Sequence, residues 1–230
     1  MASRQEPIPE GWEPVSGHHH HAGLININET CYQNSVLQAL FHIPAFITIL
    51  TVEGPQCKKN PCTSLLCAVY SVFCEMKKNK TVSPTAITSL YPLHFKLFQL
   101  GRQEDAHEFL VQFVEIISSE LQSRILQRLE GDPAVDIIPA TYRCFGGLLG
   151  LTGICSCKSI HEVDDFYLHL FMPLSHDTNS IQRGIEQLLN ETEDVLHDCE
   201  ACKKKMAIFH NSVKVKYYPQ YLVVQFPKES

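Results

Sequence analysis

A single cysteine stands where a polar turn meets a run of apolar residues near the start of the chain. Residues 23–30 form the turn, Cys31 follows, and apolar residues then recur at helical spacing: Val36, Leu37, Leu40 and Phe41. With Thr30 as an acceptable N-cap, the pattern predicts a helix that begins at Cys31 and stops before Pro44. The free N–H groups and the dipole at a helix start favour the thiolate, which is the attacking form of a cysteine.

Asn26 lies five residues before Cys31 and carries a side-chain amide. That amide can turn toward the same point and donate a hydrogen bond to an oxyanion developing on a substrate carbonyl. Cys31 is therefore a candidate nucleophile and Asn26 a candidate oxyanion donor. The alternative is that Cys31, one of ten cysteines, merely lies at the start of a core helix, and its position alone does not separate the two readings.

Helical patterns that could position these residues extend from residue 23 to about residue 130. An apolar face follows residues 62–78, and a Ser-Pro pair predicts a short helix over residues 83–90. The longest pattern has apolar residues at helical spacing from Phe109 to Ile125, so we predict a buried central helix with an acidic first turn. Acidic residues at that place are also ordinary helix-start chemistry.

The pattern changes after a loop expected at residues 131–133. One helix is expected over residues 180–189, and five strands are expected at residues 145–149, 166–171, 207–209, 213–218 and 221–226. Helices in the first half of a chain and strands in the second are typical of the α+β class.

Two close cysteine pairs lie about forty residues apart in the strand-rich half. Four thiolates on two turns make a closed tetrahedral zinc site of the structural kind, so we predict zinc bound by Cys155, Cys157, Cys199 and Cys202. The alternative is two β-turns with reduced cysteines that bind no metal. Cys67 and Cys74 lie a heptad apart on an apolar helix face and are predicted as core residues rather than ligands.

Composition excludes several classes of function. The 230 residues are 44% hydrophobic and can bury a core, and the net charge of −6 argues against a nucleic acid partner. No apolar run approaches the ~20 residues that span a bilayer, and the N-terminus has no signal-peptide pattern. We therefore expect no membrane partner and a location in the cytoplasm or nucleus. Residues 1–21, which contain four consecutive histidines, are predicted to be a flexible leader.

The string around Cys31 resembles the cysteine box of the ubiquitin-specific proteases, which are papain-like deubiquitinating enzymes. Eleven positions coincide: Gly23, Leu24, Asn26, Thr30, Cys31, Tyr32, Asn34, Ser35, Leu37, Gln38 and Leu40. The resemblance implies that Cys31 is the nucleophile and Asn26 the oxyanion donor. Two departures precede the cysteine, Asn28 for a glycine and Glu29 for an asparagine. Asn tolerates positive φ, whereas a carboxylate close to the thiolate weakens its activation.

A second segment resembles the family's Q-x-D-A-x-E-F motif, at Gln103, Asp105, Ala106, Glu108 and Phe109. In that family the turn lies near the cleft and holds the basic, glycine-ending tail of ubiquitin. The resemblance therefore implies that Gln103 and Asp105 bind substrate, and the Glu104 carboxylate could also pair with arginines. His107 lies inside this motif, but a helix start disfavours a protonated histidine, so we expect a structural or surface role for it.

The resemblance also implies an architecture: a papain-like fold with a helical thumb over residues 22–130, then zinc-bearing β fingers and part of a palm over residues 140–230. In the family, the catalytic histidine and its orienting residue lie downstream of the strand that residues 222–226 resemble. The sequence therefore predicts a truncated catalytic domain over residues 22–230, with an incomplete palm and weak or no turnover. Two functions remain open: a deubiquitinating isopeptidase acting on ubiquitinated proteins, and a catalytically silent ubiquitin-binding or scaffold module.

Overall fold

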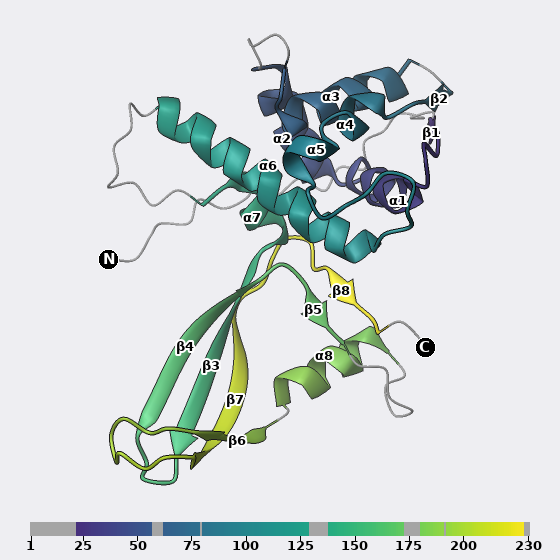
Figure 1. Ribbon diagram of the computed structural model, residues 1–230. Coiled ribbons are helices and arrows are strands. Elements are labelled where there is room, and N and C mark those ends of the chain that lie inside the picture. The colour runs from purple at the N-terminus through teal and green to yellow at the C-terminus, as the bar shows by residue number, and fades with distance from the viewer. Residues whose placement is uncertain are drawn as a thin grey trace.

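The computed structural model describes residues 22–56, 62–78, 80–128, 138–172, 180–190 and 192–227. The leader predicted for residues 1–21 and the loop predicted at residues 131–133 lie outside these ranges. The helices before residue 146 gather at one end of the molecule, a long twisted sheet extends away from them, and one further helix lies beside the sheet (Figure 1). We call these parts the helical half, up to residue 145, and the finger sheet.

The helical half is arranged around one long helix, α6, which is the central helix that the sequence predicts. Its elements are α1 (Cys31–Leu40), α2 (Pro44–Glu53), η1 (Gly54–Gln56), α3 (Leu65–Met76), α4 (Thr85–Thr88), α5 (Tyr91–His94), α6 (Ala106–Arg128) and α7 (Ala140–Phe145). The short helix predicted over residues 83–90 is confirmed in part: Pro84 is its N-cap rather than its first residue, and it ends at Thr88. Cys67 and Cys74 lie half-buried on α3.

Aromatic side chains fill the space between α6 and its neighbours. Phe95, Phe109 and Phe113 are fully buried, and the rings of Phe95 and Phe109 stack with their centroids 5.0 Å apart. Tyr32, the second residue of α1, packs edge-on against Phe109 at 5.6 Å. Because large buried rings contribute much of the apolar burial in a core, these contacts fix the start of α1 on α6.

A half-buried carboxylate joins α6 to α3. Glu120 accepts hydrogen bonds from the Ser64 hydroxyl at 2.7 Å and from the backbone N–H groups of Leu65 and Leu66 at 2.7 and 3.2 Å. These N–H groups belong to the first turn of α3 and have no partner within their own helix. Glu120 therefore caps α3 from a different helix and locks the two together.

The finger sheet is antiparallel and has the strand order β4-β3-β7-β6. Its strands are β3 (Gly147–Cys155), β4 (Ile160–Tyr167), β6 (Glu193–His197) and β7 (Ala207–Tyr217), and α8 (Ile181–Asn190) precedes β6. Two short parallel pairs complete the fold. β1 (Gly23–Leu24) pairs with β2 (Thr81–Val82), and β5 (Leu170–Phe171) pairs with β8 (Val224–Gln225).

The α+β class is confirmed, and several strand predictions need correction. Residue 145 ends helix α7 rather than beginning a strand, and residues 166–171 are divided between β4 and β5. The strands expected at 207–209 and 213–218 form one strand, because the polar residue Asn211 between them pairs with Gly153 on one side and Glu193 on the other. The sequence did not predict β6. In the ranges described, no single helix is long and apolar enough to span a membrane.

Candidate active site and metal centre

Cys31 is the first residue of α1, and its side chain is exposed. The turn before it contains two residues in the left-handed region, Asn28 with φ of 49° and Glu29 with φ of 62°. Thr30 is fully buried, and its hydroxyl accepts a hydrogen bond from the Ile27 N–H at 3.1 Å. The two left-handed residues turn the backbone, and the Thr30 hydrogen bond holds this turn. The chain therefore enters α1 with the Cys31 thiol facing solvent at the positive end of the helix.

The loop before α6 is fastened to this turn. The N–H of Gly101 donates to the Asn28 carbonyl at 2.8 Å, and Gly101 has φ of 89°, which favours glycine. The two motifs singled out in the sequence, seventy residues apart, therefore meet, and the first turn of α6 lies beside α1 (Figure 1).

Asp105 caps α6. This is the ordinary helix-start role of an acidic residue, the alternative to the substrate-binding role that the resemblance implies. Its Oδ1 accepts hydrogen bonds from the N–H groups of His107 at 2.7 Å and Glu108 at 3.3 Å. An aspartate directly before a helical run is a typical N-cap signal, and this signal alone could have identified the role. Glu104 is half-buried and accepts from the Gln99 N–H at 3.4 Å, whereas Gln103 is exposed at the surface.

His107 turns inward to a second histidine, His169, in the segment between β4 and β5. The rings meet edge to face with centroids 4.1 Å apart. His107 Nε2 and His169 Nδ1 are both buried, and neither has a hydrogen-bond partner among the described residues. Burial, and then the neighbouring His107, lower the pKa of His169 from its ordinary value. The structural role expected for His107 agrees with this placement.

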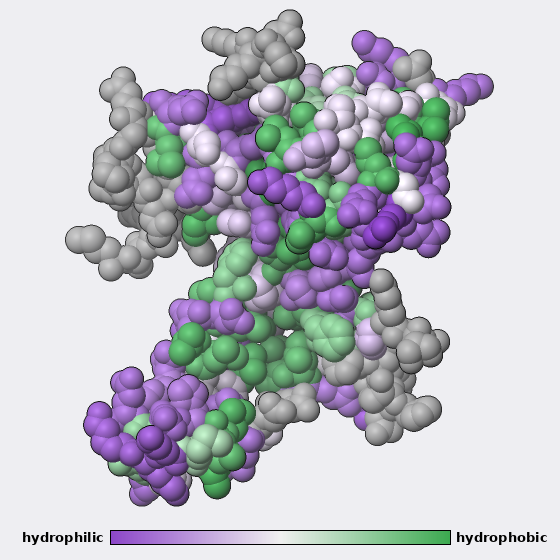
Figure 2. All heavy atoms as spheres, in the orientation of Figure 1, coloured by the Kyte–Doolittle hydropathy of each residue, from purple (hydrophilic) through white to green (hydrophobic). Residues whose placement is uncertain are grey.

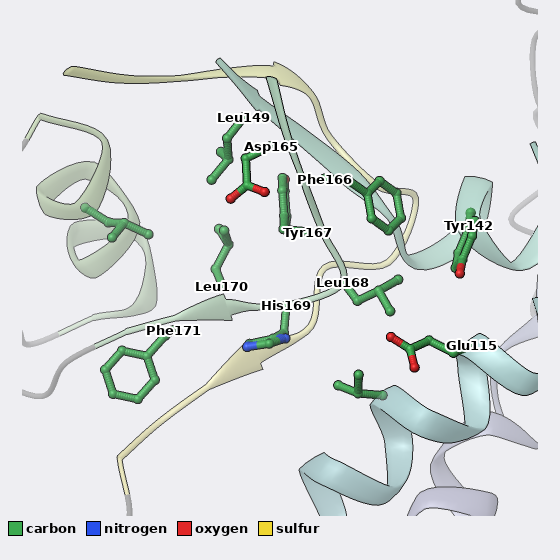
Figure 3. A pocket seen from close by; sticks show the side chains of 12 residues that line it. Glu115, Tyr142, Leu149, Asp165, Phe166, Tyr167, Leu168, His169, Leu170 and Phe171 are labelled. Carbon is green, nitrogen blue, oxygen red and sulfur yellow. The ribbon is translucent and has the colours of Figure 1, made fainter. Parts of the chain in front are cut away.

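A cavity of about 580 Å³ opens where the finger sheet meets the helical half (Figure 3). Its lining is largely apolar and includes Tyr167 and Phe171. Two acidic residues also line it, Glu115 from α6 and Asp165 from β4. A second hollow of about 750 Å³ continues along the same face of the sheet, and Leu188 of α8 lines both. Figure 2 shows apolar side chains gathered along this junction.

The four predicted metal ligands meet at the far end of the finger sheet. Cys155 and Cys157 lie at the β3–β4 hairpin, and Cys199 and Cys202 lie in the β6–β7 connection (Figure 1). All four sulfur atoms lie within 4.8 Å of one another, and Cys157 Sγ is 3.8 Å from Cys199 Sγ. The shorter Cys-x-Cys spacing is accommodated because Lys158 has φ of 71° and donates its N–H to the Cys155 carbonyl at 2.7 Å.

The geometry of this cluster fits a tetrahedral metal ion. Zinc–sulfur bonds of ~2.3 Å at tetrahedral angles place the sulfur atoms ~3.8 Å apart. Hydrogen bonds from the Cys202 backbone and from the Ser159 hydroxyl lower the pKa of Cys199 to about 5, so this ligand favours the thiolate that a metal requires. At Cys202 a hydrogen bond from the Lys204 backbone lowers the pKa, but hydrogen bonds with the neighbouring cysteine sulfur atoms outweigh it and raise the pKa to about 11, so a metal ion must displace that proton. The cluster could therefore hold a metal ion with four protein ligands and no open position.

No imidazole hydrogen-bonds the Cys31 thiol anywhere in the part of the chain that the structure describes. Asn26 is exposed, five residues before the thiol. The site as described therefore provides a nucleophile at a helix start, an amide donor and an acidic turn, without a base in contact with the nucleophile.

Comparison with known proteins places this geometry in context. The sequence model of the family described as "Ubiquitin carboxyl-terminal hydrolase" matches residues 22–230. Ubiquitin carboxyl-terminal hydrolase 36 of Drosophila ananassae is 32% identical over 197 residues, which is 81% of this chain and 18% of that protein. Its counterpart in Drosophila mojavensis is 31% identical over 199 residues, which is 81% of this chain and 16% of that protein. The chain thus spans less than a fifth of the length of these relatives.

A solved structure has a similar fold. It is the SAGA Ubp8/Sgf11/Sus1/Sgf73 DUB module bound to ubiquitin aldehyde, with a TM-score of 0.67 and 23% sequence identity. The match covers 90% of this chain and 47% of the matched chain. At this identity the likeness extends to the fold alone, and the fold is that of the family resembled by the two motifs.

Proposed function

Since the chain belongs to the ubiquitin carboxyl-terminal hydrolase family, as a catalytic domain of the ubiquitin-specific protease type, we propose that it is a cysteine-type deubiquitinase that removes ubiquitin from protein conjugates. The observation that carries the proposal is the meeting of two motifs at one place. An exposed Cys31 at the start of α1 is joined, through the Asn28–Gly101 hydrogen bond, to the acidic turn that opens α6.

The proposed reaction begins at the Cys31 thiolate. Its sulfur attacks the carbonyl carbon of ubiquitin's terminal glycine, and the carbonyl electron pair moves to oxygen, where Asn26 Nδ2 donates a hydrogen bond. The electron pair on oxygen re-forms the carbonyl and the bond to the lysine nitrogen breaks, with the nitrogen taking a proton from water as it leaves. Water then attacks the thioester carbonyl, which releases ubiquitin with a free C-terminal carboxylate and returns the Cys31 thiolate. General-base assistance to such steps is worth roughly two to four orders of magnitude, so we expect slow turnover from the residues described.

Acidic groups support recognition of a basic ubiquitin tail. Glu104 and Asp105 lie in the turn fastened to the cysteine loop, and exposed Gln103 adds an amide. Carboxylates pair favourably with arginine, so this turn is proposed to bind the tail as it enters the site. The ubiquitin body would lie against the junction of the helical half and the finger sheet, where Glu115 and Asp165 border the cavity of Figure 3.

Zinc is the metal we propose for the cysteine cluster. Four thiolates suit zinc, and a closed set without a water position is typical of structural rather than catalytic sites. Bound zinc would join the β3–β4 hairpin to the β6–β7 connection and hold the end of the finger sheet together. It would take no part in the reaction at Cys31.

A second function has an observation in its favour. Because no described imidazole contacts the thiol, the chain could bind ubiquitin without hydrolysing conjugates. In this alternative, the acidic turn and the junction cavity would serve a catalytically silent ubiquitin-binding or scaffold module.

Covalent labelling separates the two functions. Ubiquitin with a C-terminal propargylamide should label the purified protein, and Cys31→Ala should abolish labelling. Cys74→Ala, which removes a half-buried thiol on α3, is the control and should label like the wild type. Ubiquitin binding without labelling would favour the silent module, and absence of both labelling and binding would overturn the proposed function.

A further inference from the structure

The segment that carries Asn26 is held at one edge by a short parallel strand pair. The N–H of Gly23 donates to the Lys80 carbonyl and the N–H of Ile25 donates to the Val82 carbonyl, both at 2.9 Å. These bonds use the donors of the segment on one side. The carbonyl groups of Leu24 and Ile25 face the other side, toward α1.

Asn34 holds that second edge. Its Nδ2 donates to the Ile25 carbonyl at 3.1 Å and to the Leu24 carbonyl at 3.4 Å. Asn34 lies on α1 three residues after Cys31, so the helix that presents the nucleophile also holds the backbone that leads directly into Asn26. One side chain thus spans the two parts of the site.

The orientation of the Asn34 amide is itself set by buried neighbours. Gln33 Nε2 donates to Asn34 Oδ1 at 3.4 Å, and the hydroxyl of Tyr91 donates to Gln33 Oε1 at 2.9 Å. Gln33 and Tyr91 are both buried. Because the Asn34 oxygen faces a donor, its nitrogen must face the two carbonyl groups.

We propose that Asn34 is the positioning residue for the oxyanion donor: it fixes Asn26 relative to the Cys31 sulfur. Asn26 is exposed, and its side chain makes no hydrogen bond within the described ranges, so its place depends on its backbone. A donor must lie within hydrogen-bond distance of the oxygen as charge develops there, and small displacements forfeit most of its effect. This inference rests on the proposed function.

Two ubiquitin probes distinguish positioning from general structural support. Attack on ubiquitin aldehyde forms a carbon–sulfur bond and places the carbonyl electron pair on oxygen, which is the charge that Asn26 would stabilise. Attack on ubiquitin propargylamide joins sulfur to an alkyne carbon and creates no oxyanion. A positioning residue should therefore matter for the aldehyde adduct and not for the alkyne reaction.

The experiment measures the dissociation constant of the aldehyde adduct, by competition against alkyne labelling, and the alkyne labelling rate itself. Asn26→Ala should weaken the aldehyde adduct about 100-fold, which is typical for loss of one oxyanion donor. Asn34→Ala should weaken it about tenfold, because a displaced donor keeps part of its effect, while the alkyne rate stays within about twofold. Asn34→Asp keeps the side-chain shape and removes both donors, so it should show the same selective loss even if the alanine variant folds poorly.

A double variant tests whether Asn34 acts through Asn26. Asn26→Ala combined with Asn34→Ala should bind the aldehyde as weakly as Asn26→Ala alone, because the second change has no donor left to displace. Ser35→Ala is the control: this adjacent hydroxyl donates only to the Tyr32 carbonyl within α1, and both probes should react as with the wild type.

The outcomes separate failure of this inference from failure of the proposed function. Equal losses with both probes, no loss with either, or losses that multiply in the double variant would show that Asn34 does not position Asn26. If the alkyne does not label the wild type, the proposed function fails first, and the positioning role fails with it.

Discussion

The helical half and the end of the finger sheet hold their functional cysteines by opposite means. Cys31 stands on a helix packed into an extended apolar core in which Phe46, Phe95 and Phe113 are fully buried. Among the residues that the structure describes, the buried cluster at the four-cysteine end of the finger sheet consists of Cys155, Cys199, Ala207 and Phe209. Strand residues nearby, such as Val163 and Ile160, are about three-fifths exposed, at 61% and 62%.

This difference indicates what each region needs in order to stay folded. Burial of apolar surface contributes ~25 cal/mol per Å², so a region that buries little of it must obtain its stability elsewhere. The helical half has that burial and can position its loops by packing and hydrogen bonds. The finger end has few buried side chains, and its thiolates are the group best able to supply the missing stability through a metal ion.

Metal removal should have the largest effect and should affect the two regions unequally. Structural zinc sites of this kind are worth ~10–16 kcal/mol of apparent binding free energy in small peptides, so chelation or Cys199→Ser should open the finger end. Hydrogen exchange should show β6 and the paired ends of β3 and β4 losing protection while α6 keeps it. The protein should contain one zinc per chain, and Cys31→Ser, which removes an exposed thiol, should keep both zinc and protection. Equal loss of protection in α6 would contradict the comparison.

Loss of the Glu120 carboxylate should have the next largest effect, confined to the helical half. Glu120→Ala removes three hydrogen bonds that satisfy the start of α3 and should lower the free energy of unfolding by about 3 kcal/mol. Zinc content should not change. Glu115→Ala removes an exposed carboxylate from the same helix and should change the free energy of unfolding by less than about 0.5 kcal/mol. Denaturant unfolding measures both, and equal effects would show that the cap is unimportant.

The junction between the two regions should respond to pH through His169. Its pKa is lowered from the ordinary value of 6.5, by burial and then by His107. As the pH falls below 6.5, His169 therefore becomes protonated in the unfolded chain while it stays neutral in the folded protein, and the free energy of unfolding decreases. Above that pH His169 is neutral in both states and adds no pH dependence. Thermal unfolding should show a smaller decrease between pH 7 and pH 5.5 for His169→Gln than for the wild type. An identical decrease in both proteins would assign the acid sensitivity to other groups.

The contrast between the regions also explains what could be read from the sequence. The long helix α6 has apolar residues at helical spacing from Phe109 onward, so its existence and place were predictable. The cysteine cluster was predictable because metal ligands keep a recognisable spacing. Residues of β6 carry no comparable apolar pattern, because both faces of that strand are largely exposed, and the strand was missed. Pairing with β7 decides that element, and pairing is not visible in a local segment.

The sequence could identify the residues of the candidate site but not the contacts between them. Cys31 and Asn26 could be named from type and spacing, but the hydrogen bond that joins Asn28 to Gly101 links residues more than seventy positions apart. Likewise, Tyr91 reaches Gln33 across 58 positions, and His107 meets His169 across a similar distance. Such contacts follow from the packing of whole elements, so no local pattern contains them.

The smallest predicted effect concerns the turn before Cys31, where the helical half carries strain. Glu29 has φ of 62°, a conformation that costs a residue with a Cβ about 1–2 kcal/mol and costs glycine almost nothing. Replacing Glu29 by glycine would remove this cost, but glycine loses more conformational freedom on folding, which offsets part of the gain in stability. Glu29→Gly should therefore raise the free energy of unfolding by about 0.5–1 kcal/mol. Asn28→Gly is the matched control, since Asn tolerates positive φ, and should change little.

Lys158, at the finger end, has φ of 71° and offers the same test in the other region. Lys158→Gly should raise the free energy of unfolding as Glu29→Gly does only in zinc-loaded protein, because without the metal that turn has no fixed conformation whose backbone strain a glycine could relieve. A gain at Lys158 that persists after chelation would show that the finger end holds its shape by packing, as the helical half does.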